Sequence, residues 1–514
     1  RPTTQQEREA APVATAETTR GRVRTYGNWR RPTSPGLLGL GTAGTGALVV
    51  GMLITVVLIM AVGIIEAFVF AAVLGVLVLA LTIRDVHNRN VFQRIGARLG
   101  WWSTRSAGSH LYRSGPLGRS AWGTYQLPGI VAATRLTQHH DGYDRPFAML
   151  YTPKTTSYSV VIGAEPDGAA LVDEQQIDTW VADWGHWLRN LGDEPGIEGA
   201  SVTLETAPDT GLRLRREVEL SIDPDANDYS KALLREVIDR YPAGSSVVKA
   251  FVALTFSGKG AGGKRRDPDE MARELAARLP GLTGDLQATG AGAASLMSAE
   301  ELCETVRIAY DPAAAILIDE AHAAGDPVEL SWADVGPSAA ETTWSGYRHD
   351  SGWSRTWAMT SAPRGLVQAG VLARLLAPHR DIARKRVTLL YQPIDPGRAA
   401  ALVESDQRAA EFQATNRRRA AARDSLAVRA AAATAAEEAS GAGLVNFGML
   451  VTATVTDPDK AKDAAAAIDN LAATARIRLR PVYGSQDSAF AAALPLGLNL
   501  AKHVNVPDLL REKL

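Results

Sequence analysis

A glycine-rich stretch, Gly258-Lys-Gly-Ala-Gly-Gly263-Lys264-Arg265, is the first part of the sequence whose residue types and spacing suggest chemistry. It lies between an expected strand and an expected helix and approaches the phosphate-loop pattern GxxxxGK(S/T). In that pattern glycine amides and a lysine bind phosphates, and a hydroxyl binds Mg²⁺. Here Arg265 occupies the hydroxyl position, and the next helix opens with Asp267, whose carboxylate would repel phosphate at the helix N-terminus. The stretch therefore favours a flexible basic loop over a nucleotide site.

Two adjacent carboxylates, Asp319 and Glu320, follow an apolar run and mimic the acidic motif that positions Mg²⁺ and water in nucleotide-driven helicases. Without an intact phosphate loop, these carboxylates have no nucleotide to serve. The preceding Tyr310-Asp-Pro also indicates a turn that leads into a helix rather than a buried strand. A membrane-tethered nucleotide-binding protein that uses Lys264 with Asp319 and Glu320 stays open as a second interpretation.

Other reactive groups show no catalytic or metal-binding pattern in the sequence. The nine histidines have no metal-ligand spacing, and the pair His139-His140, beside Asp141 and Asp144, is expected in an exposed loop. The sequence contains no recognisable serine or cysteine nucleophile motif. We therefore expect no catalytic residue, no cofactor and no metal site, and hence a protein that is not an enzyme.

The charge balance gives little support to nucleic-acid binding. The chain has 514 residues, with 55 basic against 56 acidic side chains, so its net charge is close to zero. Basic residues do gather at 259–266 and at 417–419, which leaves a membrane-tethered nucleic-acid-handling module as a third, weaker interpretation. Salt-dependent DNA binding by the soluble part would support it.

The elements that must position these residues are organised around one apolar stretch, residues 37–83, in which Glu66 is the only ionisable side chain. A bilayer crossing needs about 20 apolar residues, and this stretch is more than twice as long. It predicts a transmembrane hairpin of two helices, at about 37–60 and 64–83, with Gly63 and Glu66 at the turn. The alternatives are a signal peptide, which would be shorter and nearer the N-terminus, and a buried core hairpin.

Basic residues flank the apolar stretch on both sides and predict its orientation. Arg30 and Arg31 precede it and Arg84 and Arg89 follow it, whereas the expected turn has no lysine or arginine. The positive-inside rule then places both termini in the cytoplasm, in a multi-pass protein of the inner (plasma) membrane. The single cysteine, Cys303, allows no intramolecular disulfide and is compatible with a reducing compartment.

Two groups of aromatic and basic residues beside the apolar stretch are candidate anchors that contact lipid headgroups or a partner. One group lies in the basic segment 20–36, and the other in an amphipathic segment at about 91–102 that is expected along the inner leaflet. The candidates are Tyr26, Trp29, Arg30, Arg31, Trp101 and Trp102.

Small residues recur every four positions in the first expected membrane helix, at Gly39, Ala43, Ala47 and Gly51. They form a strip on one face, where another helix can approach closely. The default partner is the second helix of the same hairpin, and a helix of another subunit in a homo-oligomer is the alternative.

The rest of the chain is long enough for two or three soluble domains. Its composition divides it into segments of different character. We expect a disordered tail (1–19), the basic segment (20–36), the membrane hairpin (37–83), a basic connector (84–145), a first α+β domain (146–295), a helical and loop connector (296–380) and a second α+β unit (381–514). The second unit contains a long Ala-rich helical segment at 397–440, as one helix or as a hairpin.

The first domain shows the order strand, helix, strand, strand, helix, strand, which is typical of a ferredoxin-like α+β sandwich. A strand–helix–strand pattern also lies near the end of the chain, which predicts a second unit of the same kind. The fold class is therefore α+β, with the transmembrane hairpin followed by two ferredoxin-like cytosolic units. The expected strands of the first domain are 158–162, 201–205, 212–222 and 247–256.

The segment Arg24-Thr-Tyr-Gly-Asn-Trp-Arg-Arg-Pro-Thr-Ser-Pro-Gly36 before an apolar hairpin resembles a family of actinobacterial membrane proteins. Members of that family are associated with conjugative-transfer and secretion gene clusters. The hairpin followed by an α+β domain also resembles the E component of the type VII secretion membrane complex. Two further stretches are similar to the N-terminal, non-motor region of the traffic ATPase of type IV secretion systems: Ser298-Ala-Glu-Glu-Leu-Cys-Glu-Thr-Val-Arg-Ile-Ala-Tyr-Asp-Pro312 and Ser488-Ala-Phe-Ala-Ala-Ala-Leu-Pro-Leu-Gly497.

The resemblance implies a non-enzymatic membrane scaffold that docks other subunits of a secretion or DNA-transfer machine. It does not choose between a type IV and a type VII-like system. The sequence reaches Leu514 without a motor domain after the helper-like region, so the ATPase is expected to be a separate cytosolic protein. Sheet edges and helix faces would serve for assembly.

Overall fold

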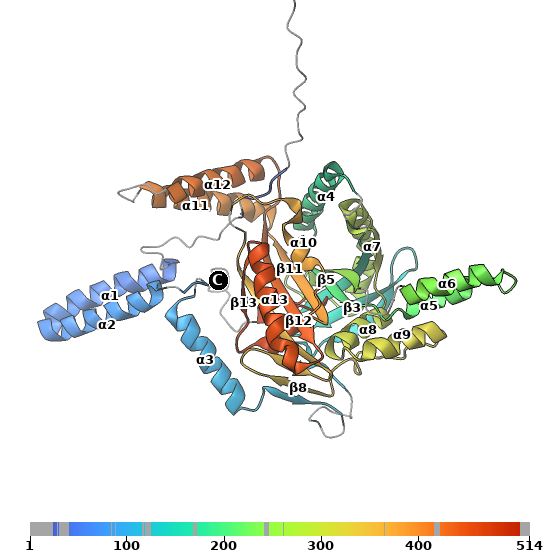
Figure 1. The fold of residues 1–514 in the computed structure, drawn as a ribbon. Coiled ribbons are helices and arrows are strands. Elements are labelled where there is room, and N and C mark those ends of the chain that lie inside the picture. Colours follow the sequence, from blue (N-terminus) through green and yellow to red (C-terminus); the bar gives the residue numbers. More distant parts are fainter. Residues whose placement is uncertain are drawn as a thin grey trace, which may run out of the picture.

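The computed structural model describes residues 24–27, 29, 41–83, 85–87, 89–115, 118, 125–166, 168, 172–240, 246–260, 262–363, 365–415 and 422–503. Within these residues the strands form one antiparallel sheet of thirteen strands. Helices cover both faces of the sheet, and helical hairpins project from it (Figure 1). The expected mixed α+β fold is confirmed, and its antiparallel sheet is continuous.

Four strands form the first unit of the sheet, in the order β7-β4-β6-β5. The elements of this unit are β4 (Ser157–Glu165), α4 (Glu174–Asp193), β5 (Ile197–Pro208), β6 (Ser246–Ser257), α7 (Pro268–Leu286) and β7 (Ala293–Leu296). Nearly every side chain of β4 is buried, because both faces of the sheet are covered at this point.

A helical hairpin, α5 (Leu212–Ser221) and α6 (Asp228–Arg240), joins β5 to β6. The expected strand at 212–222 is therefore wrong. Leucine and arginine alternate at the start of this segment, but arginine and glutamate are good helix formers. The neighbouring strand that 212–222 was expected to supply is β6, which pairs with β5 along its whole length.

The second unit repeats the connectivity of the first, in the order β13-β10-β12-β11. It begins inside the expected connector 296–380, because β10 pairs with both β12 and β13. The elements are β10 (Gly352–Ser361), α10 (Ala373–Leu376), β11 (Arg384–Pro393), β12 (Val445–Val455), α13 (Ala461–Thr474) and β13 (Arg478–Pro481).

A second helical hairpin, α11 (Pro396–Thr415) and α12 (Ala422–Ala439), joins β11 to β12. Of the two forms expected for 397–440, the hairpin is the one present. The many alanine side chains let the two helices pack along their length. Residues 416–421, which include the arginine run, lie outside the described residues.

The two units join edge to edge through β5 and β11, which pair antiparallel, with Tyr391 opposite Ala200 and Lys385 opposite Thr206. The α5–α6 hairpin leaves from the end of β5, and the α11–α12 hairpin leaves from the end of β11. Because the two strands run in opposite directions, the hairpins leave opposite ends of the sheet (Figure 1).

Short strands extend the sheet at both edges. They are β9 (Tyr347–His349), β8 (Ala339–Thr342) and β1 (Leu111–Arg113) beyond β10, and β3 (Pro146–Thr152) and β2 (Arg135–His140) beyond β4. The expected connectors at 84–145 and 296–380 thus supply strands that the sequence did not predict. β1, β8 and β9 have only three or four residues, too few to show a period, and the six-residue β2 is mostly polar. The pair His139-His140 ends β2 instead of lying in a loop.

Different helices cover the two faces of the sheet. On one face, α4 and α7 bury the first unit around Leu254, and α10 and α13 bury the second around Val451. On the other face, α8 (Ala299–Tyr310) packs on α14 (Gln486–Ala492), with the rings of Tyr310 and Phe490 5.1 Å apart. The stretches 298–312 and 488–497, which carry part of the resemblance, therefore share one core.

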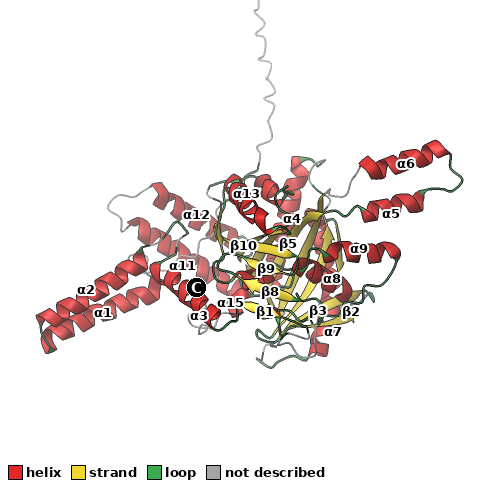
Figure 2. Cartoon of the chain, turned by 60° about the horizontal axis from the view of Figure 1, so that its bottom comes forward, coloured by secondary structure: helices red, strands yellow, loops and turns green. Residues whose placement is uncertain are grey.

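The N-terminal helices stand apart from the sheet. α1 (Gly41–Ala61) and α2 (Ile64–Thr82) form an antiparallel pair that projects from the body (Figure 2), and α3 (Val91–Ser106) follows at its base. The two expected helices are thus present, although residues 37–40 lie outside the described residues, and their crossing of a membrane stays a prediction. Two further α-helices are α9 (Ala314–Ala324), which follows α8, and α15 (Leu500–His503).

Candidate membrane-facing surface

The α1–α2 pair presents its apolar side chains to the surroundings rather than to the protein. Met60, Ile65 and Phe68 are 85%, 77% and 75% exposed, and Ala67 is the buried residue of α2. Among the described residues, α2 is the one helix that is long and apolar enough to cross a bilayer, and the apolar part of α1, Leu48–Ala61, is shorter. Water-soluble monomers rarely expose an apolar patch of this size.

The two helices approach each other closely at a glycine. A Cβ atom at Gly51 would lie 2.6 Å from Cδ2 of Leu74 on α2, so the absence of a side chain permits the contact. At this position the expected helix contact is made within the hairpin. The structure does not describe Gly39, Arg30 and Arg31, or the side chains of Ala43 and Ala47.

α3 begins with a capping box. The side chain of Asn90 accepts a hydrogen bond from the Gln93 amide, and the side chain of Gln93 accepts one from the Asn90 amide. The helix runs across the axis of the α1–α2 pair rather than along it (Figure 1). Large apolar side chains recur on one exposed face of α3, which we call the α3 stripe: Phe92, Ile95, Leu99 and Trp102.

The tandem tryptophans of α3 point in different directions. Trp101 is half-buried, and its ring lies 6.2 Å from that of Trp344 in the body. Trp102 belongs to the α3 stripe and is 71% exposed. Neighbouring helix residues point about 100° apart, so only one of the two rings faces the sheet. Trp102 is placed where a membrane anchor could act, whereas Trp101 is a packing residue.

Tyr26 and Trp29 contact the protein's own body. The Tyr26 hydroxyl donates to Asp178 of α4 at 2.7 Å, and the Tyr26 backbone forms two hydrogen bonds of 2.8 Å with Val367. The Trp29 ring meets that of Phe447 on β12 edge-on, with centroids 5.4 Å apart. Both residues are partly buried by these intramolecular contacts, and their role as anchors for lipid or a partner stays a prediction.

The helix pair and the start of α3 coincide with a match to a known family. Residues 33–93 match a family model described as a domain of unknown function (DUF8461). The matched range ends in the first turn of α3, and its description names no activity. No curated protein matches the chain.

The glycine-rich loop at 258–265 pairs with itself and with its neighbours. The Gly258 amide donates to the Thr156 carbonyl at 2.7 Å, and the Gly260 amide donates to the Lys264 carbonyl at 2.9 Å. The Gly263 amide donates back to the Gly260 carbonyl at 2.8 Å. These amides are already satisfied by the backbone, so they do not form the open cradle that a phosphate needs.

The carboxylates that the alternative, nucleotide-binding interpretation needs lie far from this loop. Asp319 and Glu320 are in α9, and Asp319 accepts a hydrogen bond from the Thr210 hydroxyl at 2.8 Å. Thr210 follows the end of β5, whereas the loop follows the end of β6, and these strands are antiparallel. The length of β6, about 40 Å at 3.3 Å per residue, therefore separates the two parts.

Three buried charges, which the sequence analysis did not single out, join the two units of the sheet. Glu205 of β5 forms ion pairs with Arg384 and Arg386 of β11. Burial by itself raises the pKa of Glu205, but the two guanidinium groups outweigh burial and lower this pKa to about 2. The Arg386 guanidinium also lies 5.0 Å from the centre of the Phe490 ring. The cluster is buried and has a structural role.

A histidine and a serine form a second buried polar pair that the sequence analysis missed. Nδ1 of His349 lies 2.6 Å from the Tyr310 carbonyl oxygen, and Nε2 lies 2.7 Å from the Ser354 hydroxyl. This is the arrangement of a base beside a nucleophile. Both residues are fully buried, however, so no substrate reaches them. Burial lowers the pKa of His349 to about 4, which keeps the ring neutral.

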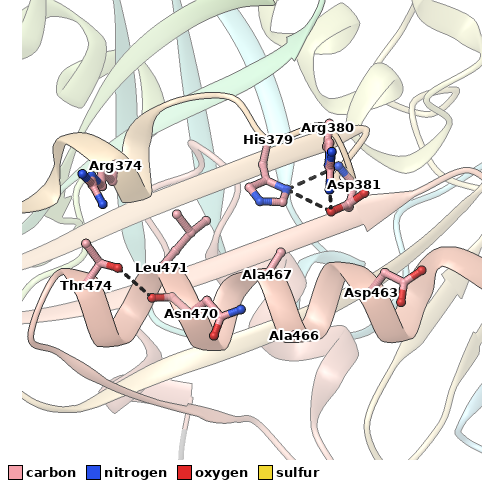
Figure 3. A pocket seen from close by; sticks show the side chains of 10 residues that line it. All are labelled: Arg374, His379, Arg380, Asp381, Asp463, Ala466, Ala467, Asn470, Leu471 and Thr474. Carbon is pink, nitrogen blue, oxygen red and sulfur yellow. Dashed lines mark hydrogen bonds and ion pairs between the residues drawn. The ribbon is translucent and has the colours of Figure 1, made fainter.

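An open groove of about 580 Å³ lies between α13 and the loop after α10 (Figure 3). The Asp381 carboxylate lies 3.6 Å from Nδ1 of His379 and 3.8 Å from Nε of Arg380 there. The groove occurs where the first unit has the 20-residue α4 and the second has only the four-residue α10. Nothing in its lining is arranged for catalysis, and the described chain has no group of three or more metal-binding side chains.

Proposed function

We propose that the chain is a non-enzymatic integral membrane scaffold subunit of an actinobacterial secretion or conjugative DNA-transfer complex. The observation that carries the membrane part is the outward apolar surface of α1 and α2, which the rest of the described chain leaves almost uncovered. With 21 and 19 residues, the two helices are about 30 Å long, which is the thickness of the hydrocarbon core. They act as a transmembrane hairpin.

The charges around the hairpin support an orientation with the sheet in the cytoplasm. Glu66 lies in the first turn of α2, at the far end of the pair, where its carboxylate favours the helix N-terminus and reaches water on the outer side. Arg94, Arg98 and Arg105 are exposed on α3 at the base of the pair. The α3 stripe then lies along the inner leaflet.

The soluble part consists, in this proposal, of two ferredoxin-like half-domains. The β-α-β-β-α-β order and the matching strand orders of the two units support this assignment. Each half-domain carries a helical hairpin between its second and third strands. A partner therefore meets a rigid sheet with two projecting hairpins.

The α5–α6 hairpin and α9 point away from the α1–α2 pair (Figures 1 and 2) and offer a docking surface for the cytosolic partner. Several large apolar side chains are exposed there, as at protein interaction sites. We call this surface the distal patch: Leu220, Tyr229, Leu233, Ile316 and Leu317. The resemblance to secretion proteins suggests a separate traffic ATPase as its occupant.

Cysteine labelling in spheroplasts tests the topology. The native Cys303 is buried, and burial raises the pKa of its thiol to about 12, so the background is low. A membrane-impermeant maleimide should label Val62→Cys from outside and Ser106→Cys only after permeabilisation. Equal labelling of the two variants in closed spheroplasts, or release of the chain by alkaline carbonate, would contradict the transmembrane hairpin.

A mild-detergent pull-down from native membranes tests the partner. We expect an ATPase to co-purify and to carry all of the nucleotide hydrolysis, and Tyr229→Arg to weaken its capture without releasing the chain from the membrane. Lys264→Ala is the matched control and should change neither result. If the chain alone hydrolysed ATP and Lys264→Ala abolished this, the scaffold proposal would fail in favour of the nucleotide-binding interpretation.

A further inference from the structure

The free end of the α11–α12 hairpin lies on the same side of the molecule as the α1–α2 pair in both views (Figures 1 and 2). Its direction follows from the sheet, because the hairpin leaves the end of β11 that is opposite to the exit of α5–α6. α11 has 20 residues and is therefore about 30 Å long. A bilayer that α1 and α2 enter lies within reach of this hairpin.

Two large apolar side chains are exposed near the free end. Phe412 precedes the end of α11 by about one turn and is 69% exposed, and Leu426 follows the start of α12 by about one turn and is 57% exposed. At the other end of α11, Ala399 and Val403 are buried. Apolar burial thus holds the base of the hairpin to the body, whereas the apolar residues at the free end lack such cover in the chain as described.

The charge pattern of the hairpin defines how it can meet a membrane. α11 carries Glu404, Asp406, Arg408 and Glu411 within two turns, and charges of this density do not enter the hydrocarbon core. The hairpin therefore cannot cross the bilayer as α1 and α2 do. Its end can rest at the headgroup boundary, where apolar rings and charged side chains both find suitable surroundings.

We propose that the free end of the α11–α12 hairpin is a second, peripheral contact of the protein with the lipid bilayer, made by Phe412 and Leu426. The proposal rests on the membrane location proposed above. A single helical hairpin in the membrane lets the body tilt about its base. A second contact at a distance from the first holds the sheet in one orientation relative to the membrane.

Fluorescence from single introduced cysteines tests this contact in the full-length chain. Phe412→Cys and Leu426→Cys are labelled with an environment-sensitive dye and reconstituted into phosphatidylcholine and phosphatidylglycerol vesicles, with or without nitroxide-labelled lipids. We expect blue-shifted emission and quenching by the nitroxide lipid at both positions. Leu220→Cys and Tyr229→Cys, which flank the connection of the α5–α6 hairpin, are the matched controls and should show neither effect. Val73→Cys, at an exposed position in the middle of α2, reports on the anchor.

The outcomes separate this proposal from the one on which it rests. Quenching at Val73→Cys without quenching at either α11–α12 position would overturn the second contact and leave the anchor intact. The absence of quenching at all positions, Val73→Cys included, would overturn the membrane location. Equal quenching at Tyr229→Cys would also overturn the proposal, because the chain would then adsorb to lipid without a preferred orientation.

Discussion

Burial shifts the pKa values of ionisable side chains in the core of this protein, and it also keeps them away from any substrate. Cys303 is a buried thiol with a raised pKa, and His349 is a buried imidazole with a lowered pKa. Neither is exposed to a substrate, and each packs in the core between α8, α14 and the sheet. Their effect is therefore on stability, and it depends on pH.

Stability is expected to fall as the pH drops from about 6.5 towards 4 because of His349. Its folded pKa is about 4, against 6.5 when unfolded, so in this window the unfolded chain binds a proton that the folded chain excludes. The free energy of unfolding is therefore highest above pH 6.5, and acidification towards pH 4 lowers it by up to about 3 kcal/mol. Denaturant unfolding of the detergent-solubilised chain at several pH values measures this.

The control for this prediction is His349→Gln, which should weaken packing at neutral pH and flatten the pH dependence between 6.5 and 4. The nearby charges are Arg386, which lowers the pKa of His349, and Asp311, which raises it. An unchanged pH slope in the variant would assign the acid sensitivity to a different group.

Sequence patterns could identify Trp102 but not the partners of Tyr26. Trp102 shares a helix face with Phe92, Ile95 and Leu99, and such spacing is visible along a single segment. Tyr26 meets Asp178, which is 152 residues away in the chain. No local pattern shows a contact between residues so far apart. The sequence therefore predicted the role of Tyr26 only from the aromatic and basic residues around it.

At the level of elements, hydroxyl groups of the sheet hold the segment that follows α14. The Thr388 hydroxyl donates to the Ala493 carbonyl at 2.8 Å, and the Thr255 hydroxyl donates to the Gly497 carbonyl at 2.6 Å. Gly497 has a φ of +63°, and a Cβ there would lie 2.4 Å from Oγ1 of Thr255. The segment fits against the sheet because residue 497 has no side chain.

Gly497→Val is expected to displace this segment and to destabilise the protein by about 1–3 kcal/mol, because valine in the left-handed region is strained. Limited proteolysis should then cut the chain after α14 faster than in the native protein. Gly448→Ala is the matched control, since a Cβ at Gly448 meets nothing within 4 Å. Equal protection of Gly497→Val and native protein would contradict the close fit.

Long elements with a clear apolar pattern were predicted from sequence, and short or charged ones were not. The apolar residues around Trp187 repeat at the helix period, and the strand around Leu254 is a continuous, nearly apolar run that is buried on both faces. The sequence of α5 has few apolar residues, and leucine and arginine alternate at its start. This alternation has the period of a strand and led to the wrong prediction. The three-residue β1 and β9 lie below the length at which a period can be seen.

For the molecule as a whole, the Glu205 cluster links the two units. Glu205→Gln should leave Arg384 and Arg386 buried without a counter-charge and cost about 3–5 kcal/mol. In the native protein the contribution of Glu205 to the free energy of unfolding is fully present above pH 4.5. It is lost as the pH falls towards 2, because the pKa of Glu205 is lowered in the folded state. Urea unfolding followed by tryptophan fluorescence measures the loss.

A variant that replaces all three charges tests the mechanism of this effect. Glu205→Leu combined with Arg384→Leu and Arg386→Met should recover most of the stability, because no buried charge is left without its partner. An unfolding midpoint of Glu205→Gln equal to that of the native protein would show that the cluster does not hold the units together.

The sequence indicated two α+β units but not that they share one sheet. Edge pairing between β5 and β11 uses backbone hydrogen bonds, which leave no mark in the side-chain pattern. The run Arg384-Lys385-Arg386 is also typical of an exposed strand end, yet all three residues are buried. Arg384 and Arg386 pair with Glu205, which is 179 residues away from Arg384, whereas Lys385 donates to the Ala377 carbonyl.

The antiparallel pairing of β5 with β11 also sets a length. One hairpin leaves each end of the joined strands, and strands of 10 to 12 residues span roughly 33–40 Å. If the two proposals above hold, a partner bound at the distal patch stands at least this far from the lipid. Whatever that partner delivers must then cross the same distance before it reaches the bilayer.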